Sequence, residues 1–184
     1  MLRDDALRLA LNASGAAVVT IVAGDRSMEP TLHGGDAILA VPLPGPPARG
    51  DLLVFRQSAE LVVHRYLGSA RTRDGSPCLR TRGDGRFELD PPVDRSAVRA
   101  RVAAMRRGGA WRSLEGAGPR VYAALVAWHD LAWAGAAHAA RPVRLSGVIA
   151  ALDRALLRLL TRVALPLAHR RLDAPLEAVP RVSV

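Results

Sequence analysis

The hydrophobic positions of the chain follow a β pattern between residues 16 and 115. Short apolar runs rich in Val and Ile alternate there with clusters of Gly, Pro, Asp and Ser, which is typical of strands joined by turns. The expected strands lie in AAVVTIVAG (16–24), DAILAVPL (36–43), DLLVFRQ (51–57), ELVVHRYLG (60–68), CLRTRG (78–83) and AVRARVAAMRRGGAWRSL (97–114). The last stretch contains two strands that meet at Gly108-Gly109. This part of the chain is therefore predicted to be a mainly β domain.

Both ends of the chain have helical spacing instead. Residues 2–11 suit a short helix, and the composition changes at EGAGPR (115–120), after which alanine and leucine recur at helical steps. A break is expected at Arg141-Pro142, followed by another helix over about 145–172. The predicted organisation is a short amino-terminal helix (1–15), a β domain (16–115) and an α-helical carboxyl-terminal extension (116–184).

Composition adds two constraints on the kind of protein. The chain of 184 residues is 49% hydrophobic, enough to bury a core, and its net charge of +9 comes from arginine because the sequence contains no lysine. Such a charge favours anionic partners such as phospholipid or nucleic acid. Cys78 is the single cysteine, so an internal disulfide and a thiol-based zinc cluster are excluded.

The apolar segments do not predict a membrane span. The amino-terminal run over 15–23 is short and follows two acidic residues, and the stretch 121–140 contains Asp130 together with two histidines. The helix expected over 145–172 is amphipathic and basic, with Arg154, Arg158 and Arg162 on one face. Its apolar face contains Ile149, Leu152, Leu156, Leu159, Val163 and Leu167. This helix either lies on an anionic membrane or packs on the rest of the protein. The expected location is therefore membrane-associated, either peripheral or weakly anchored, with a cytoplasmic protein as the alternative.

The stretch GDRSMEPTLHGGD (24–36) raises the question of chemistry, because Ser27 stands in a loop after a predicted strand. A serine surrounded by Pro and Gly is commonly only a turn residue. A nucleophilic serine needs a base within hydrogen-bond reach, and without lysine the β region offers only His33 and His64. His33 is expected to be exposed beside Gly34, whereas strand alternation directs His64 to the face opposite Val63.

A third group would orient the imidazole. Asp84 and Asp90 stand in the turn-rich segment RGDGRFELDPP (82–92), and a carboxylate on the far nitrogen would fix the tautomer of His64. Both positions also suit ordinary turns. The spacing does not decide which of the two carboxylates would take this place.

The order of the segments resembles the conserved boxes of the type I signal peptidase family. These boxes are SMEPTL with GGD at 34–36, RGDLLVF (49–55), VVHR (62–65) and RGD (82–84) with Asp90 beyond, and together they cover roughly half of the chain, Ala17 to Trp111. The chain is most similar to the archaeal and endoplasmic-reticulum branch, in which histidine replaces the lysine base. The resemblance implies a signal-peptidase-like complex β fold.

The same resemblance assigns roles to individual residues. It implies that Ser27 is the acylated nucleophile, that His64 is the general base and then the acid, and that Asp90 orients His64. Asp84 has a supporting role or takes the place of Asp90. Met28 and Pro30 match the motif around the serine, and they would present Ser27 and contact the substrate.

The residues before the serine depart from the family pattern. Many signal peptidases have serine and glycine there, and that serine hydroxyl helps to bind the oxyanion, whereas this chain has Asp25 and Arg26. An ionised Asp25 cannot donate a hydrogen bond, so only the backbone N–H of Ser27 is assigned to the oxyanion hole. Arg26 is expected to be a solvated loop residue or to pair with Asp25 or Glu29.

The expected function is therefore that of a serine endopeptidase that cleaves a leader or signal peptide after a small residue through a Ser/His/Asp acyl-enzyme mechanism. This chemistry needs neither a metal nor a cofactor, and nucleic acid is not expected as a partner. Two alternatives stay open. The enzyme could process one dedicated partner, or the domain could be an inactive binding module that its basic helix attaches to a membrane.

Overall fold

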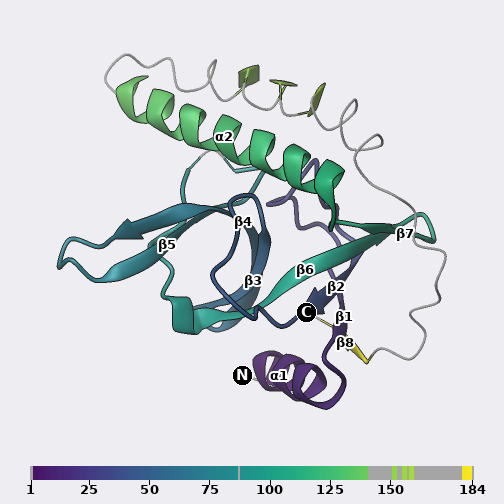
Figure 1. The fold of residues 1–184 in the computed structure, drawn as a ribbon. Coiled ribbons are helices and arrows are strands. Elements are labelled where there is room, and N and C mark those ends of the chain that lie inside the picture. The colour runs from purple at the N-terminus through teal and green to yellow at the C-terminus, as the bar shows by residue number, and fades with distance from the viewer. Residues whose placement is uncertain are drawn as a thin grey trace.

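The computed structural model describes residues 2–86, 88–140, 151–152, 155–156, 158–159 and 180–183. In this part of the chain a single β-sheet is accompanied by two long helices (Figure 1). The elements are α1 (Leu2–Ser14), β1 (Ala17–Thr20), β2 (Ala37–Val41), β3 (Leu52–Gln57), β4 (Glu60–Arg71), β5 (Pro77–Arg82), the 3₁₀ turn η1 (Arg95–Ala97), β6 (Val98–Arg107), β7 (Ala110–Ser113), α2 (Ala117–Ala140) and β8 (Arg181–Ser183). The prediction of a mainly β domain with a helix after it is confirmed.

The sheet is antiparallel at all but one of its pairings among the described residues. Its strand order is β5-β4-β3-β6-β2-β1-β8, with β7 paired to β6 beside this path. The exception is β8, which runs parallel to β1 with Val19 opposite Val182. This strand was not predicted; it lies in the extension expected over 116–184, beyond the helix expected to end at about residue 172. A strand of three residues produces no periodic signal of its own.

Two buried clusters occupy the two faces of the central strands. On β3, Leu52 and Val54 belong to a cluster shared with α1 and α2, whereas Leu53 and Phe55 belong to a second one, as alternation in a strand requires. Figure 1 shows α2 across one side of the sheet and α1 near β1 and β8 at the opposite end. Adjacent residues of one strand therefore point into different environments, which matters for the site below.

The hairpin between β6 and β7 turns where the sequence predicted. Gly108 and Gly109 have φ values of +58° and +82°, a left-handed conformation that glycine adopts without steric cost. The β4–β5 hairpin is longer than predicted, because β4 continues to Arg71 and only residues 72–76 form the turn. Strand pairing with β5 thus extends over residues whose polar composition suggested a loop.

The helices after the sheet are described only in part. The predicted break at Arg141-Pro142 and most of the helix expected over 145–172 lie outside the described residues. Where the structure describes that helix, Leu152, Leu156 and Leu159 are exposed. Within the described part of the chain, no helix combines the length and the apolar character that crossing a membrane requires.

Candidate active site

Ser27 lies in the loop between β1 and β2, and both ends of this loop are fixed. The N–H of Ile21 donates to the carbonyl of Asp36 at 2.8 Å, and the N–H of Gly35 donates to the carbonyl of Ile21 at 3.0 Å. Next to the serine, Met28 is buried in the core with 3% of its surface exposed. Ser27 itself is half-buried. The loop thus holds the hydroxyl at the protein surface on an anchored backbone.

His64 lies on β4, opposite Leu53 on β3, and only 3% of it is exposed. Its ring packs against that of Phe55 in a T-shaped arrangement with centroids 6.1 Å apart, so it occupies the face opposite Val63, as predicted. Nδ1 lies 2.7 Å from Oδ2 of Asp90, whereas Nε2 has no hydrogen-bond partner in the described structure. Because a carboxylate accepts from Nδ1–H, the proton of the neutral ring is on Nδ1 and Nε2 has a free lone pair. This is the tautomer that a general base needs.

Asp90 is itself held in place by β5. The hydroxyl of Thr81 donates to Oδ2 of Asp90 at 2.7 Å, and the N–H of Asp90 donates to the carbonyl of Thr81 at 3.0 Å. A carboxylate fixed by backbone and side chain at once restricts the orientation of the imidazole that it binds. Sequence reasoning found Asp90 but missed Thr81, which looks like any other threonine in a strand.

Ser27 and His64 line the same cavity, which has a volume of about 990 Å³. The segment after β5 closes tightly against both: a Cβ at Gly83 would lie 2.4 Å from the Ser27 carbonyl oxygen and 2.8 Å from Nε2 of His64. The N–H of Gly85 donates to that same carbonyl at 2.8 Å. Glycine at position 83 therefore allows the serine loop and the histidine to approach each other.

The hydroxyl of Ser27 is not bonded to His64 in this structure. Its Oγ lies 3.3 Å from Oδ2 of Asp25, and the backbone N–H of Ser27 donates to Oδ1 of Asp25 at 2.8 Å. The donor assigned to the oxyanion hole is thus occupied by a carboxylate. No second oxyanion donor is identified among the described residues.

The carboxylate bonded to His64 is that of Asp90, whereas Asp84 is bonded to Arg65 and Thr31, so the alternative that Asp84 replaces Asp90 is wrong. Both of its carboxylate oxygens accept from Arg65, Oδ1 from Nε at 2.8 Å and Oδ2 from Nη2 at 2.6 Å, and Thr31 also donates to it. Arg65 donates further to the Gly50 carbonyl at 2.8 Å. This buried ion pair ties the loop of Ser27 to β4, so its contribution is to position the loop. Sequence reasoning missed Arg65, although it stands beside His64.

Of the other residues singled out in the sequence, some line the cavity of Ser27 and others lie outside it. Met28 lines the cavity, whereas Pro30 is not among the residues that form its wall. Arg26 pairs with Glu29 at 3.2 Å, one of the two pairings expected for it. His33 is exposed, as predicted.

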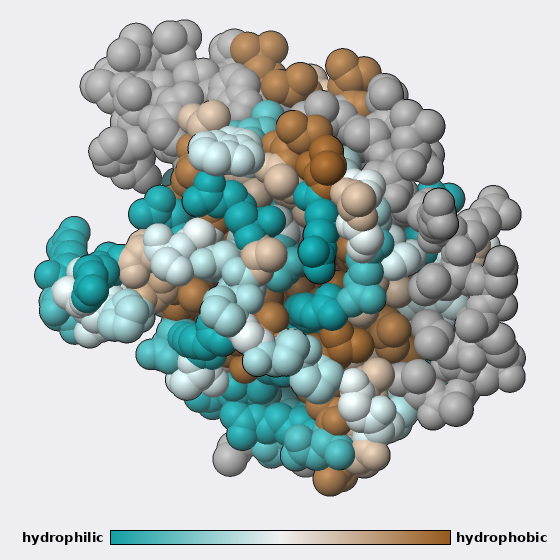
Figure 2. Space-filling view, viewed as in Figure 1, coloured by the Kyte–Doolittle hydropathy of each residue, from teal (hydrophilic) through white to brown (hydrophobic). Residues whose placement is uncertain are grey.

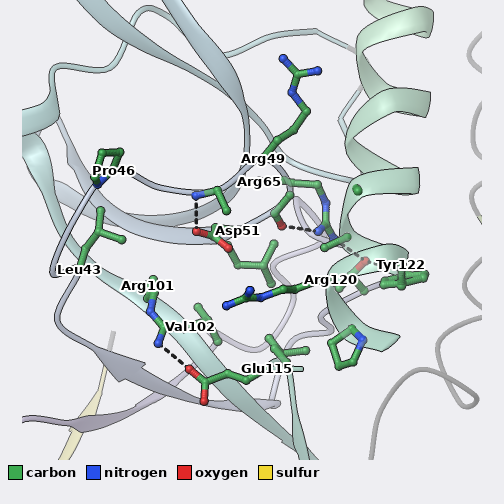
Figure 3. Close-up of a pocket in the computed structure, with 18 of the residues that line it drawn as sticks. Leu43, Pro46, Arg49, Asp51, Arg65, Arg101, Val102, Glu115, Arg120 and Tyr122 are labelled. Carbon is green, nitrogen blue, oxygen red and sulfur yellow. Dashed lines mark hydrogen bonds and ion pairs between the residues drawn. The ribbon is translucent and has the colours of Figure 1, made fainter. Parts of the chain in front are cut away.

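A second cavity of about 540 Å³ lies near Arg65, between the loop after β2 and α2. Figure 3 shows Arg120 reaching from α2 into this space between Asp51 and Glu115, with Arg101 bonded to Glu115. Four arginines and two acidic residues line this cavity, whereas the charged residues that line the cavity of Ser27 are mostly acidic: Asp25, Glu60, Glu88 and Asp90, with Arg86.

Comparison with protein-family models, curated proteins and solved structures gave no match for this chain. The interpretation of the site therefore depends on its own geometry and on the order of the sequence motifs.

Proposed function

We propose that the protein is a serine endopeptidase of the signal-peptidase type, which cleaves a leader or signal peptide after a small residue. The observation that carries this proposal is the buried His64, which lines the same cavity as Ser27 and whose Nδ1 is bonded to Asp90, while its buried Nε2 has no partner among the described residues. A buried polar nitrogen without a partner costs about 1–3 kcal/mol, so its retention favours a use in chemistry.

The proposed mechanism uses these residues in turn. Oγ of Ser27 attacks the scissile carbonyl carbon and its proton passes to Nε2 of His64, while Asp90 stabilises the imidazolium. The tetrahedral intermediate collapses by breaking the C–N bond, and Nε2 returns the proton to the leaving amine. Water, deprotonated by His64, then hydrolyses the Ser27 ester and restores the hydroxyl.

Walls of the cavity also suit an extended peptide. They include apolar side chains of β1, β3 and β4, among them Val19, Val54 and Leu61. An extended substrate beside strands gains main-chain hydrogen bonds, and the apolar side chains select what lies between them. The preference for a small residue before the cleaved bond comes from the family resemblance.

The proposal is tested by incubating the purified chain with a library of leader peptides and identifying the products by mass spectrometry. Ser27→Ala and His64→Ala are each expected to reduce cleavage by about 10³-fold or more, with unchanged circular dichroism. Ser113→Ala is the matched control, because that serine lies on β7, outside the wall of the cavity, and should keep full activity. Undiminished turnover by Ser27→Ala would refute the proposal, and so would inactivity of the wild type on every peptide, which would favour the binding module instead.

We further propose that the protein associates peripherally with anionic membranes. On α2, Val121, Leu125 and Trp128 recur at helical steps and are 61%, 52% and 59% exposed, and the guanidinium of Arg49 lies 4.7 Å from the Trp128 ring. Figure 2 shows hydrophobic side chains gathered along the edge of the molecule where α2 and the described residues of 151–159 lie. An exposed apolar stripe beside arginine suits an anionic interface.

Co-sedimentation with vesicles tests this association. Binding to phosphatidylserine vesicles should weaken with salt and should fall in a Trp128→Ser variant. Equal binding of both proteins would show that this stripe is not the contact surface.

A further inference from the structure

Asp25 is hydrogen-bonded to both groups of Ser27 that the proposed reaction needs, the backbone N–H and the hydroxyl. Oδ1 accepts the backbone N–H at 2.8 Å, and Oδ2 lies 3.3 Å from Oγ. His64 lines the same cavity as Ser27, and its buried Nε2 has no partner in the described structure. The nucleophile and its base are thus close to each other but not engaged.

The local sequence explains why this bond forms. The pattern Asp-x-Ser occurs at two other places, and there too the aspartate accepts the serine N–H: Asp94 from Ser96 at 2.7 Å and Asp74 from Ser76 at 3.4 Å. Ser76 also donates its hydroxyl to Asp74 at 3.2 Å. Aspartate readily binds the backbone two residues onward. What distinguishes position 25 is that the serine held in this way lines the same cavity as a buried histidine.

We infer that Asp25 is a positioning residue that holds Ser27 in a resting state, which the substrate must release. This inference rests on the proposed peptidase function. For the reaction to proceed, the Ser27 N–H must exchange its hydrogen bond with Oδ1 of Asp25 for one with the scissile carbonyl oxygen. The Oγ of Ser27 must likewise leave Oδ2 of Asp25 and bond to Nε2 of His64. The carboxylate leaves for solvent, where Asp25 is already exposed.

The inference also accounts for the departure from the family pattern before the serine. A hydroxyl at position 25 could donate to the developing oxyanion, whereas a carboxylate there competes with it for the same N–H. Removing the carboxylate should therefore speed up the reaction, which is the opposite of what loss of a supporting group would do.

A neutral alkyl fluorophosphonate measures this directly. Oγ of Ser27 displaces fluoride at phosphorus, forming the O–P bond while the proton passes to His64. The rate constant of labelling is determined for the wild type, Asp25→Ala, Asp25→Asn and Asp25→Ser. Asp94→Ala is the matched control, since it breaks the same local bond in an identical Asp-Arg-Ser sequence away from the cavity. Ser27→Ala is the blank.

Asp25→Ala should label about tenfold faster or more, because a hydrogen bond to a charged group is no longer broken first. The labelling rate of Asp25→Asn should rise less, since its neutral amide oxygen still accepts a hydrogen bond from Ser27. Asp25→Ser should show the largest rise in the rate of peptide cleavage. Asp94→Ala should label at the wild-type rate. If the wild type labels at Ser27 and Asp25→Ala is equal or slower, the inference is overturned and the peptidase stands. If neither the wild type nor Asp25→Ala labels faster than Ser27→Ala, the proposed function is refuted, and the inference that rests on it is refuted as well.

Discussion

Two aspartates partner two adjacent residues of β4, yet the two pairs differ in how completely their hydrogen bonds are satisfied. Arg65 is bonded to Asp84 through two nitrogens and to the Gly50 carbonyl through a third, and all of this lies in the interior. His64 is equally buried, but only Nδ1 has a partner, Asp90, within the described residues. A satisfied buried pair holds the structure together, whereas an unsatisfied buried nitrogen beside a cavity is available for chemistry.

The largest effect is expected from Asp90→Asn. An amide at this position donates to Nδ1, so His64 adopts the tautomer with the proton on Nε2 and loses its function as a base. We expect a loss of kcat of about 10⁴-fold on a leader peptide, with little change in the urea midpoint. A decrease below about tenfold would contradict the role of Asp90.

Arg65→Leu should act on stability instead. It leaves the carboxylate of Asp84 buried without its cation, which costs about 3–5 kcal/mol of unfolding free energy in urea titrations. Adding Asp84→Leu removes the uncompensated charge and should restore most of the lost unfolding free energy. If Arg65→Leu were as stable as the wild type but inactive, the distinction between the two pairs would be wrong.

Gly83→Ala tests the point where the two pairs meet. The added methyl group would overlap with the Ser27 carbonyl and the edge of His64, so we expect a loss of about 1–3 kcal/mol in stability and a larger one in activity. Gly45→Ala is the control, because its Cβ meets nothing within 4 Å. If the two variants had equal stability and equal activity, Ser27 and His64 would lie farther apart than in this structure.

The smallest effect concerns a third carboxylate pair, Asp4 of α1 with Arg99 of β6, which is only partly buried. Hydrogen bonds from Arg99 at 2.6 and 3.1 Å lower the pKa of Asp4 below the ordinary value of 3.8. A lowered folded-state pKa contributes stability above pH 3.8 that is lost as pH falls through the folded-state pKa. Asp4→Asn should therefore cost about 1 kcal/mol at pH 7, and the difference should shrink in acid. A difference that does not vary with pH would exclude the charge as its cause.

The sequence predicted most local features of the fold, because alternation and glycine turns are local signals, whereas the residues of the candidate site came from the resemblance to signal peptidases. Strands β1 to β4, the turn at Gly108-Gly109 and helix α2 could be predicted in this way. Strand β8 could not, since only its pairing with β1 defines it. For the same reason spacing alone could not choose between Asp84 and Asp90, because the choice depends on which of two adjacent side chains of β4 each one meets.

The Asp25–Ser27 bond is a different case. Its sequence signal was present, since Asp-Arg-Ser occurs twice in the chain, and the second copy forms the same bond. The sequence alone does not give the position of His64 relative to Ser27. That position decides whether the serine held in this common turn can act as a nucleophile.

Mass spectrometry of the acylated protein tests the central claim most directly. The chain is incubated with an activated ester of a peptide that ends in alanine, quenched in acid and digested. The account predicts that the acyl group is found on Ser27 of the wild type and is lost in His64→Ala. An acyl group on another residue, or equal acylation of the wild type and His64→Ala, would contradict it.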